Sequence, residues 1–98
     1  MYTLRIEHSV TAIDAWKAAF DRFAATRRES GVRQHRIHRP IDDPAYVLVD
    51  LGFETAEASE KFLDFLQTRV WSTPQNAPAL IGTPQTRILE LVVGEATV

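Results

Sequence analysis

Hydrophobic and polar residues follow two periodicities along this chain. Apolar side chains at every second position predict four strands, at Tyr2–His8, Val32–Arg39, Ala45–Phe53 and Gln85–Val93. Apolar side chains three and four residues apart predict two helices, at Thr11–Ser30 and Thr55–Trp71. The resulting order is strand, helix, strand, strand, helix, strand. This order predicts an α+β domain of the ferredoxin-like βαββαβ type.

Residues that begin and end helices support these bounds. Thr11 and Thr55 each precede a helical segment, and their hydroxyls can cap its first turn. Gly31 follows a basic last turn and suits the left-handed conformation that ends a helix. In the loop before the last strand, a short turn of helix is expected around Ala77–Ile81.

The topology follows from the handedness of strand–helix–strand units. Right-handed crossovers in both units give a four-stranded antiparallel sheet of order 4-1-3-2, with both helices on one face. In this order the polar strand Val32–Arg39 lies at an edge and the apolar strand Ala45–Phe53 lies inside. The length of the chain fits one domain over residues 1–98.

The sheet face turned away from the helices is predicted to be partly apolar. Its predicted residues combine apolar and charged side chains: Arg5, Tyr46, Leu48, Asp50, Ile88, Glu90 and Val92. An exposed apolar patch of this kind commonly marks an interface, so we predict a homodimer with sheet packed on sheet. Because an unpaired charge is costly to bury, Arg5 and Asp50 are expected to pair across neighbouring strands.

Composition excludes several classes of function. The apolar fraction of 45% and the charged fraction of 24% are ordinary for a globular domain. The absence of cysteine excludes disulfides, cysteine–zinc sites and a thiol nucleophile. A net charge of −2 argues against nucleic acid as a partner. No signal-peptide pattern or membrane-length apolar segment is present, so we expect a cytoplasmic protein without membrane contact.

Three histidines are candidates for chemistry. His35 and His38 are three residues apart on a predicted strand and therefore face opposite sides, which argues against a shared metal. His8 and His35 are placed on the helix side of the sheet, where they could line a pocket for a small molecule. The alternative is a partly buried histidine satisfied by a backbone carbonyl.

The two tryptophans are candidates for the same pocket. Trp16 lies in the apolar stripe of the first helix, and Trp71 lies at the end of the second. Tryptophan in such places packs in a core or at its rim, or walls a flat aromatic ligand. The candidate ligand-binding residues are therefore His8, Trp16, His35 and Trp71, and no catalytic residue or metal ligand is assigned.

Three segments carry a family resemblance: Ala15–Phe20, the Arg39–Pro44 turn and Thr83–Ile88. Over its whole length the chain resembles the dimeric α+β barrel superfamily, which includes antibiotic-biosynthesis monooxygenases, haem-degrading monooxygenases and short actinobacterial proteins labelled cyclases or monooxygenases. The resemblance implies a homodimer with its ligand between helices and sheet. It also implies at most a monooxygenase-like oxidoreductase that acts on an aromatic substrate without metal or flavin.

Two other functions are disfavoured: haem degradation, which belongs to this superfamily, and RNA recognition, which belongs to a different class with the same βαββαβ order. The haem-degrading branch holds iron through a histidine of the second helix, and Thr55–Trp71 has none, so no cofactor is predicted. RNA-recognition domains stack bases on aromatic residues of this sheet, but here only Tyr46 is available, beside Asp50 and Glu90. The leading hypothesis is a cofactor-independent monooxygenase-like or small-molecule-binding homodimer, with His8 or His35 taking a substrate proton. The alternative is a non-catalytic ligand-binding or structural homodimer.

Overall fold

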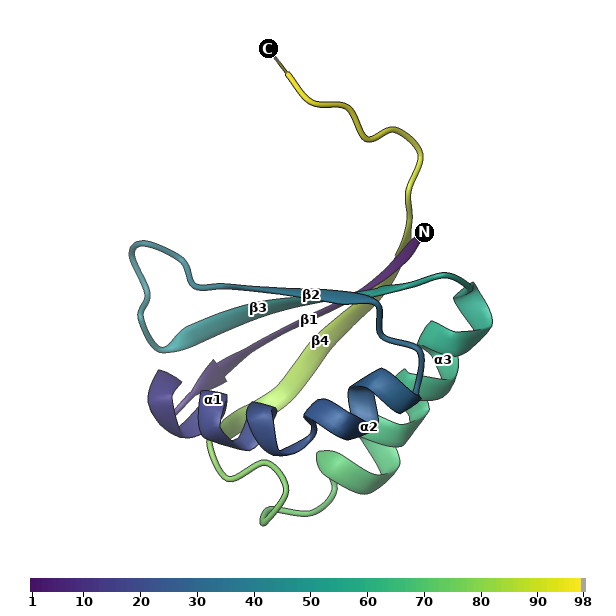
Figure 1. Ribbon diagram of the computed structural model, residues 1–98. Coiled ribbons are helices and arrows are strands. Elements are labelled where there is room, and N and C mark those ends of the chain that lie inside the picture. The colour runs from purple at the N-terminus through teal and green to yellow at the C-terminus, as the bar shows by residue number, and fades with distance from the viewer. Residues whose placement is uncertain (98) are drawn as a thin grey trace.

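The computed structural model describes residues 1–97 and consists of two layers (Figure 1). Its elements in chain order are β1 (Tyr2–Val10), α1 (Ile13–Arg22), α2 (Ala24–Glu29), β2 (Gln34–His38), β3 (Tyr46–Phe53), α3 (Ala56–Phe65), the π-helical turn η1 (Leu66–Val70) and β4 (Leu80–Glu90). The helices cover one face of an antiparallel sheet of order β2-β3-β1-β4. This confirms the predicted order 4-1-3-2 and the ferredoxin-like fold. In the described residues, no helix has the length and apolar character needed to cross a membrane.

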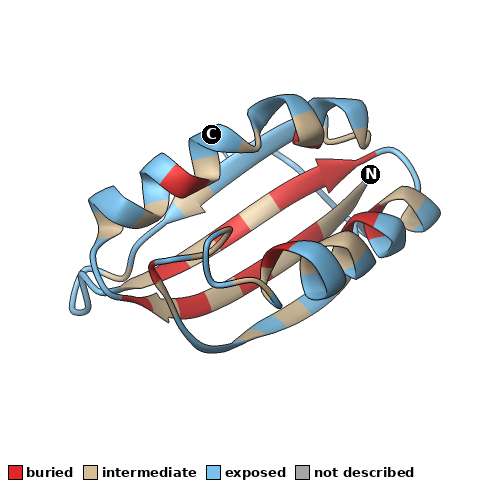
Figure 2. Cartoon of the chain, turned by 90° about the horizontal axis from the view of Figure 1, so that it is seen from below, coloured by how far each residue is buried: buried red, intermediate tan, exposed pale blue. Residues whose placement is uncertain are grey.

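The core lies between the two central strands and the helices (Figure 2). Alternate residues of β1 and β3 point into it, with Leu4 opposite Leu51 and Ile6 opposite Val49. Phe62 of α3 closes the core from the helix layer. The apolar alternation of these strands therefore fixes which sheet face the helices cover.

The first predicted helix is two helices. Phe23 has φ −99° and ψ 16°, which interrupts the helical backbone between α1 and α2. The helix begins at Ile13 after Ala12, so the predicted cap by Thr11 is wrong. The Thr11 backbone N–H instead donates to the Ala79 carbonyl, 2.9 Å away. A long apolar stripe continued across Phe23 and concealed the break.

Two other predicted helix ends are confirmed. The Thr55 hydroxyl accepts a hydrogen bond of 3.1 Å from the Ala58 N–H and caps α3. Gly31 has φ 95°, the left-handed conformation that suits glycine at a helix end.

Strand β4 begins earlier than predicted. It starts at Leu80, and the segment predicted as a helical turn consists of hydrogen-bonded turns followed by strand. The pairing with β1 shifts between Glu7 and Ser9, where a bulge accommodates Gly82 with φ 74°. Pro84 also lies in this bulge, where its missing N–H costs no ladder bond. The glycine and proline that suggested a loop therefore mark a bulge within a strand.

The face assignment predicted for β4 is wrong. Ile88 lies opposite Leu4 and packs against the core, so it faces the helices. Glu90 shares that side by register, and Val92 lies beyond the end of the strand. Leu89 takes the place on the uncovered face. Ile88 and Leu89 are adjacent and both apolar, so the alternation of apolar residues alone does not show which of them faces the helices.

The uncovered face carries the predicted residues of β1 and β3. Arg5 donates to both Asp50 carboxylate oxygens at 2.8 Å, as expected from the sequence. The hydrogen bond from Arg5 is the main cause of a lowered Asp50 pKa. Tyr46 donates to the Glu7 carboxylate at 2.8 Å, and Leu48 lies half-buried between these pairs. This face therefore combines apolar side chains with paired charges, and by register it also carries Arg36 and Arg87, which form none of the salt bridges of the described residues.

Candidate functional site

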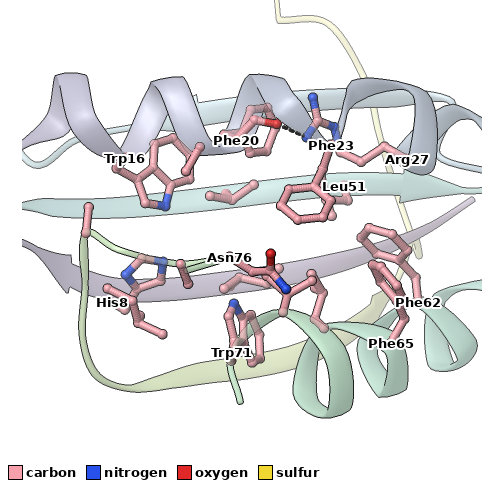
Figure 3. Close-up of a pocket in the computed structure, with 18 residues that line it drawn as sticks. His8, Trp16, Phe20, Phe23, Arg27, Leu51, Phe62, Phe65, Trp71 and Asn76 are labelled. Carbon is pink, nitrogen blue, oxygen red and sulfur yellow. Dashed lines mark hydrogen bonds between the residues drawn. The ribbon is translucent and has the colours of Figure 1, made fainter. Parts of the chain in front are cut away.

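A cavity of about 80 Å³ lies between the helices and the sheet (Figure 3). A single buried water requires at least roughly 10–15 Å³ on this scale, and an engineered cavity that binds benzene measures roughly 150 Å³, so this cavity can hold water and has about half the volume of that benzene site. Its walls are largely apolar and come from β1, β3, all three helices, η1 and the loop that leads to β4. This cavity lies on the side of the sheet where the sequence analysis placed its candidate ligand-binding residues.

Stacked aromatic rings form the wall that α1 contributes. The Trp16 and Phe20 rings lie 5.1 Å apart at 24°, since residues four apart on a helix are neighbours. Phe23, at the helix break, and Phe62 and Phe65 of α3 extend the aromatic lining (Figure 3). Such a lining favours a flat apolar ligand.

The opposite wall is formed where η1 ends. The π-turn is closed by a 2.8 Å bond from the Trp71 backbone N–H to the Leu66 carbonyl, and it presents the Trp71 ring to the cavity. Asn76 donates its side-chain N–H to the Arg69 carbonyl at 2.8 Å. This bond orients the amide so that its oxygen points into the cavity (Figure 3). The sequence analysis missed Asn76, whose one signal is its position in the loop after a helix end.

His8 is the titratable group on the cavity floor. It is buried, with 6% of its surface exposed, and its Nδ1 lies 2.9 Å from the Ser9 carbonyl oxygen. A carbonyl only accepts, so Nδ1 carries the proton of the neutral ring and Nε2 keeps a free lone pair. Burial lowers the His8 pKa, partly offset by this hydrogen bond. The ring is therefore neutral near pH 7.

The His8 Nε2 atom makes no hydrogen bond within residues 1–97. In residues 1–97, every fully enclosed side-chain nitrogen or oxygen has a hydrogen-bond partner. Nε2 has none in that part of the chain, so it is not fully enclosed, and the His8 side chain lines the cavity. One nitrogen of His8 is bound to a backbone carbonyl, as the structural alternative in the sequence analysis expects. The other nitrogen is an unprotonated base.

His35 does not line this cavity, and that prediction is wrong. It shares the helix side of the sheet, opposite Leu51, as predicted. However, β2 is an edge strand and His35 is exposed, with its ring edge-on to Phe20 at 5.3 Å. His38, opposite Leu48, lies on the other face, which confirms that the two histidines point apart.

Arg27 is a buried cation behind the cavity wall. It is 7% exposed, its Cζ lies 3.5 Å from the Phe20 ring centroid, and it donates to the Phe20 carbonyl at the helix break. Figure 3 shows its guanidinium turned toward the end of α1 rather than into the cavity. Burial is the main cause of its lowered pKa. Arg27 therefore supports the aromatic wall and holds the break.

The cavity combines an aromatic lining with a few polar atoms. His8 Nε2 and the Asn76 side-chain oxygen are acceptors, and the indole N–H groups of Trp16 and Trp71 are donors. A flat aromatic molecule that carries a hydroxyl or an acidic C–H offers an apolar surface to this lining and a proton to one of its acceptors.

Fold and cavity together define a small ferredoxin-like α+β domain with an internal aromatic pocket, and oxygenases are among the solved structures that share this fold. No family model matches the sequence, and no curated protein sequence matches it.

Three similar structures illustrate the likeness. SnoaB, a cofactor-independent oxygenase from Streptomyces nogalater, has a TM-score of 0.73 and 18% identity over 95% of this chain and 94% of its own. A monooxygenase from the gene ActVA-Orf6 of Streptomyces coelicolor, in complex with nanaomycin D, has a TM-score of 0.71 and 13% identity over 99% and 92%. A dimeric ferredoxin-like protein from an uncultured marine organism has a TM-score of 0.71 and 12% identity over 96% and 97%. These similarities confirm the fold that the sequence resemblance implied.

Proposed function

We propose that the protein is a monooxygenase-like homodimer that binds an electron-rich aromatic molecule in its cavity and oxidises it with O₂. The observation that carries this proposal is the His8 side chain in the lining of an aromatic cavity, with Nδ1 bound to the Ser9 carbonyl and Nε2 left as a base. The likeness to a cofactor-independent oxygenase and to a monooxygenase supports it. The proposed reaction consumes O₂ as its second substrate and involves no cofactor.

The proposed chemistry is a proton abstraction followed by oxygenation. His8 Nε2 takes a proton from an activated CH₂ group, and the resulting carbanion forms a C–O bond with O₂. The proton returns from Nε2 to the outer oxygen and gives a hydroperoxide. Loss of the remaining C–H proton to His8 then breaks the O–O bond, and hydroxide leaves and is protonated to water. In total, R₂CH₂ and O₂ give R₂C=O and H₂O.

Oxygen uptake with anthrone tests the proposal. We expect wild-type protein to accelerate uptake and His8→Asn to lose this acceleration by roughly 10²-fold or more, the usual contribution of a general base. Asparagine can keep the donor to Ser9 while losing Nε2. His38→Asn, the same change on the open face, is the matched control and should retain activity.

Size is part of this test, because the cavity of about 80 Å³ is smaller than the roughly 150 Å³ of a benzene-binding cavity. A single-ring quinol therefore requires a small outward movement of the cavity lining, and anthrone requires a larger movement of Trp71 or its loop. Binding of either without any O₂ uptake would favour the non-catalytic alternative, since it would leave His8 as a structural residue.

The homodimer is proposed from the open face. Leu48, Leu89 and Tyr46 lie there beside the Arg5–Asp50 pair, and no element of residues 1–97 covers them. A similar structure is described as dimeric. A second sheet packed on this face would bury its apolar part while Arg5 and Asp50 keep each other as partners, and Arg36 and Arg87 on the same face would need partners or solvent. A cytoplasmic location stays a prediction.

A further inference from the structure

A second hollow adjoins the cavity in the helix layer. It is a groove of about 590 Å³ between α2 and α3, and it shares two lining residues with the cavity, Phe62 and Phe65. The two rings stack on each other, with centroids 5.8 Å apart and planes at 29°. Figure 3 shows both rings at the end of the cavity away from His8. These two phenylalanines therefore separate the cavity from the groove.

Phe65 is the part of this partition that can move. Phe62 is a core residue with 3% of its surface exposed, whereas Phe65 is half-buried. Phe65 is also the last residue of α3, and the π-helical turn η1 begins at the next residue. The groove beyond its ring gives it space into which it can turn. Such a turn would join the two hollows and give the cavity of about 80 Å³ the room that it lacks for a ring.

The groove differs from the cavity in its chemistry. Its wall beyond the two phenylalanines is formed mainly by hydroxyl groups, carboxylates and one ammonium group. These polar residues are Thr26, Glu29, Ser30, Thr55, Glu57 and Lys61. Lys61 pairs with Glu57 at 3.0 Å, and Glu29 forms none of the salt bridges of residues 1–97. A wall with hydroxyl groups and one surplus carboxylate favours a neutral group that carries hydroxyls over an anion.

We propose that the groove is a second compartment of the ligand site, which takes a neutral hydroxyl-bearing group joined to the aromatic ring in the cavity, and that Phe65 is the movable partition between them. The inference rests on the aromatic ligand of the proposed function and not on its oxidation. When the acidic proton of the ring faces His8, a substituent on the opposite side of the ring faces Phe65 (Figure 3). The ligand class is therefore an electron-rich aromatic ring with a polyol or sugar group opposite its acidic proton.

Arbutin, which is hydroquinone with glucose on one oxygen, is a probe of this class, and hydroquinone is its counterpart without the sugar. In ¹H–¹⁵N titrations both should shift the indole N–H signals of Trp16 and Trp71. Only arbutin should also shift the backbone signals of residues 26–30 and 55–61. Its Kd should lie about 10-fold below that of hydroquinone, as expected for one or two added hydrogen bonds in the groove.

Two phenylalanine substitutions test the partition. Phe65 lines both hollows, whereas Phe23, also half-buried, lines the cavity alone. In the wild type, arbutin binds only when Phe65 has turned, so its association rate constant should be about 10-fold or more below that of hydroquinone. Stopped-flow tryptophan fluorescence measures both rates. Phe65→Ala should remove the difference, and Phe23→Ala, the matched control, should keep it.

A surface pair tests the groove without disturbing the core. Glu29→Ala removes an exposed carboxylate from the groove wall and should raise the Kd of arbutin by about 3–10-fold, with no change for hydroquinone. Glu60→Ala, the same change at an exposed residue that lines neither hollow, should alter neither Kd.

The outcomes separate this inference from the proposed function. Groove signals that shift with arbutin while the indole signals stay fixed would overturn the inference, because the groove would then be a separate site. Binding of hydroquinone without binding of arbutin would also overturn it and leave the proposed function intact. Equal association rates in the wild type would remove the role of Phe65 as a partition. If neither compound binds, the aromatic ligand of the proposed function fails as well.

Discussion

At the scale of single residues, the site depends on how each polar group is held. The two nitrogens of His8, a residue that lines the cavity, have different environments, one fixed by the Ser9 carbonyl and one without a hydrogen bond in residues 1–97. Arg27 and Asn76 contribute equally specific bonds, to the Phe20 and Arg69 carbonyls. These hydrogen bonds fix the orientation of the polar side chains around the cavity.

Acid should destabilise the protein through His8. Its folded-state pKa lies below the ordinary value of 6.5, so the unfolded chain binds the proton more readily. The contribution to stability is therefore complete above about pH 6.5 and is lost as the pH falls through the folded pKa. Thermal unfolding of the wild type and of His8→Asn should be measured across this pH range. The melting temperature should fall less at acidic pH in the variant than in the wild type. Parallel curves would contradict the buried neutral ring.

Removing the Arg27 side chain should lower the free energy of unfolding more than removing the side chain of its exposed neighbour Arg28. Arg27→Ala leaves the Phe20 carbonyl without its side-chain donor and exposes the aromatic wall, for an expected loss of about 1–3 kcal/mol in the free energy of unfolding. Arg28→Ala, on the exposed side of the same helix, should change it by less than about 0.5 kcal/mol. Urea unfolding at one fixed protein concentration measures both. Equally small effects of the two substitutions would mean that the contacts of Arg27 do not stabilise the fold.

Part of the site could be predicted from sequence at this scale. Periodicity placed His8, Trp16 and Trp71 correctly at the helix–sheet boundary, because apolar spacing reports which side of an element is buried. It missed Arg27 and Asn76 because their polar side chains are placed by single hydrogen bonds to distant carbonyls. It misplaced His35 because facing the helices does not ensure cover at an edge strand.

At the scale of elements, the strong signals were those repeated over many residues. Strands β1 and β3 and the helix layer follow from long alternations with one apolar phase. Strand β4 has adjacent apolar residues on both faces, so only its pairing with β1, which brings Ile88 opposite Leu4, fixes the phase. The break at Phe23 and the bulge at Gly82 depend on tertiary packing, which no local pattern encodes.

The two threonines that precede the helices provide a paired test of capping. Thr55→Ala should lower the free energy of unfolding by about 1 kcal/mol, because it removes the acceptor for the Ala58 N–H. Thr11→Ala should have almost no effect, since the Thr11 hydroxyl caps no helix in the structure. Chemical denaturation distinguishes them. A similar cost at both positions would contradict the helix start at Ile13.

At the scale of the whole molecule, the open face sets the assembly. Light scattering at micromolar concentration should give about twice the chain mass for the wild type. Leu48→Glu should give the single-chain mass, because it places a charge among the apolar residues of the proposed interface. Ile41→Glu serves as the charge-matched control. A dimer that persists in Leu48→Glu would place the interface elsewhere.

The central claim is that the space between helices and sheet accepts an aromatic ligand, and the two tryptophans of this chain both line that space. A ¹H–¹⁵N spectrum therefore reports on the cavity directly through its two indole N–H signals. Titration with a single-ring quinol should move both signals together and saturate at a common Kd. Indole signals that stay fixed up to millimolar quinol would contradict the account.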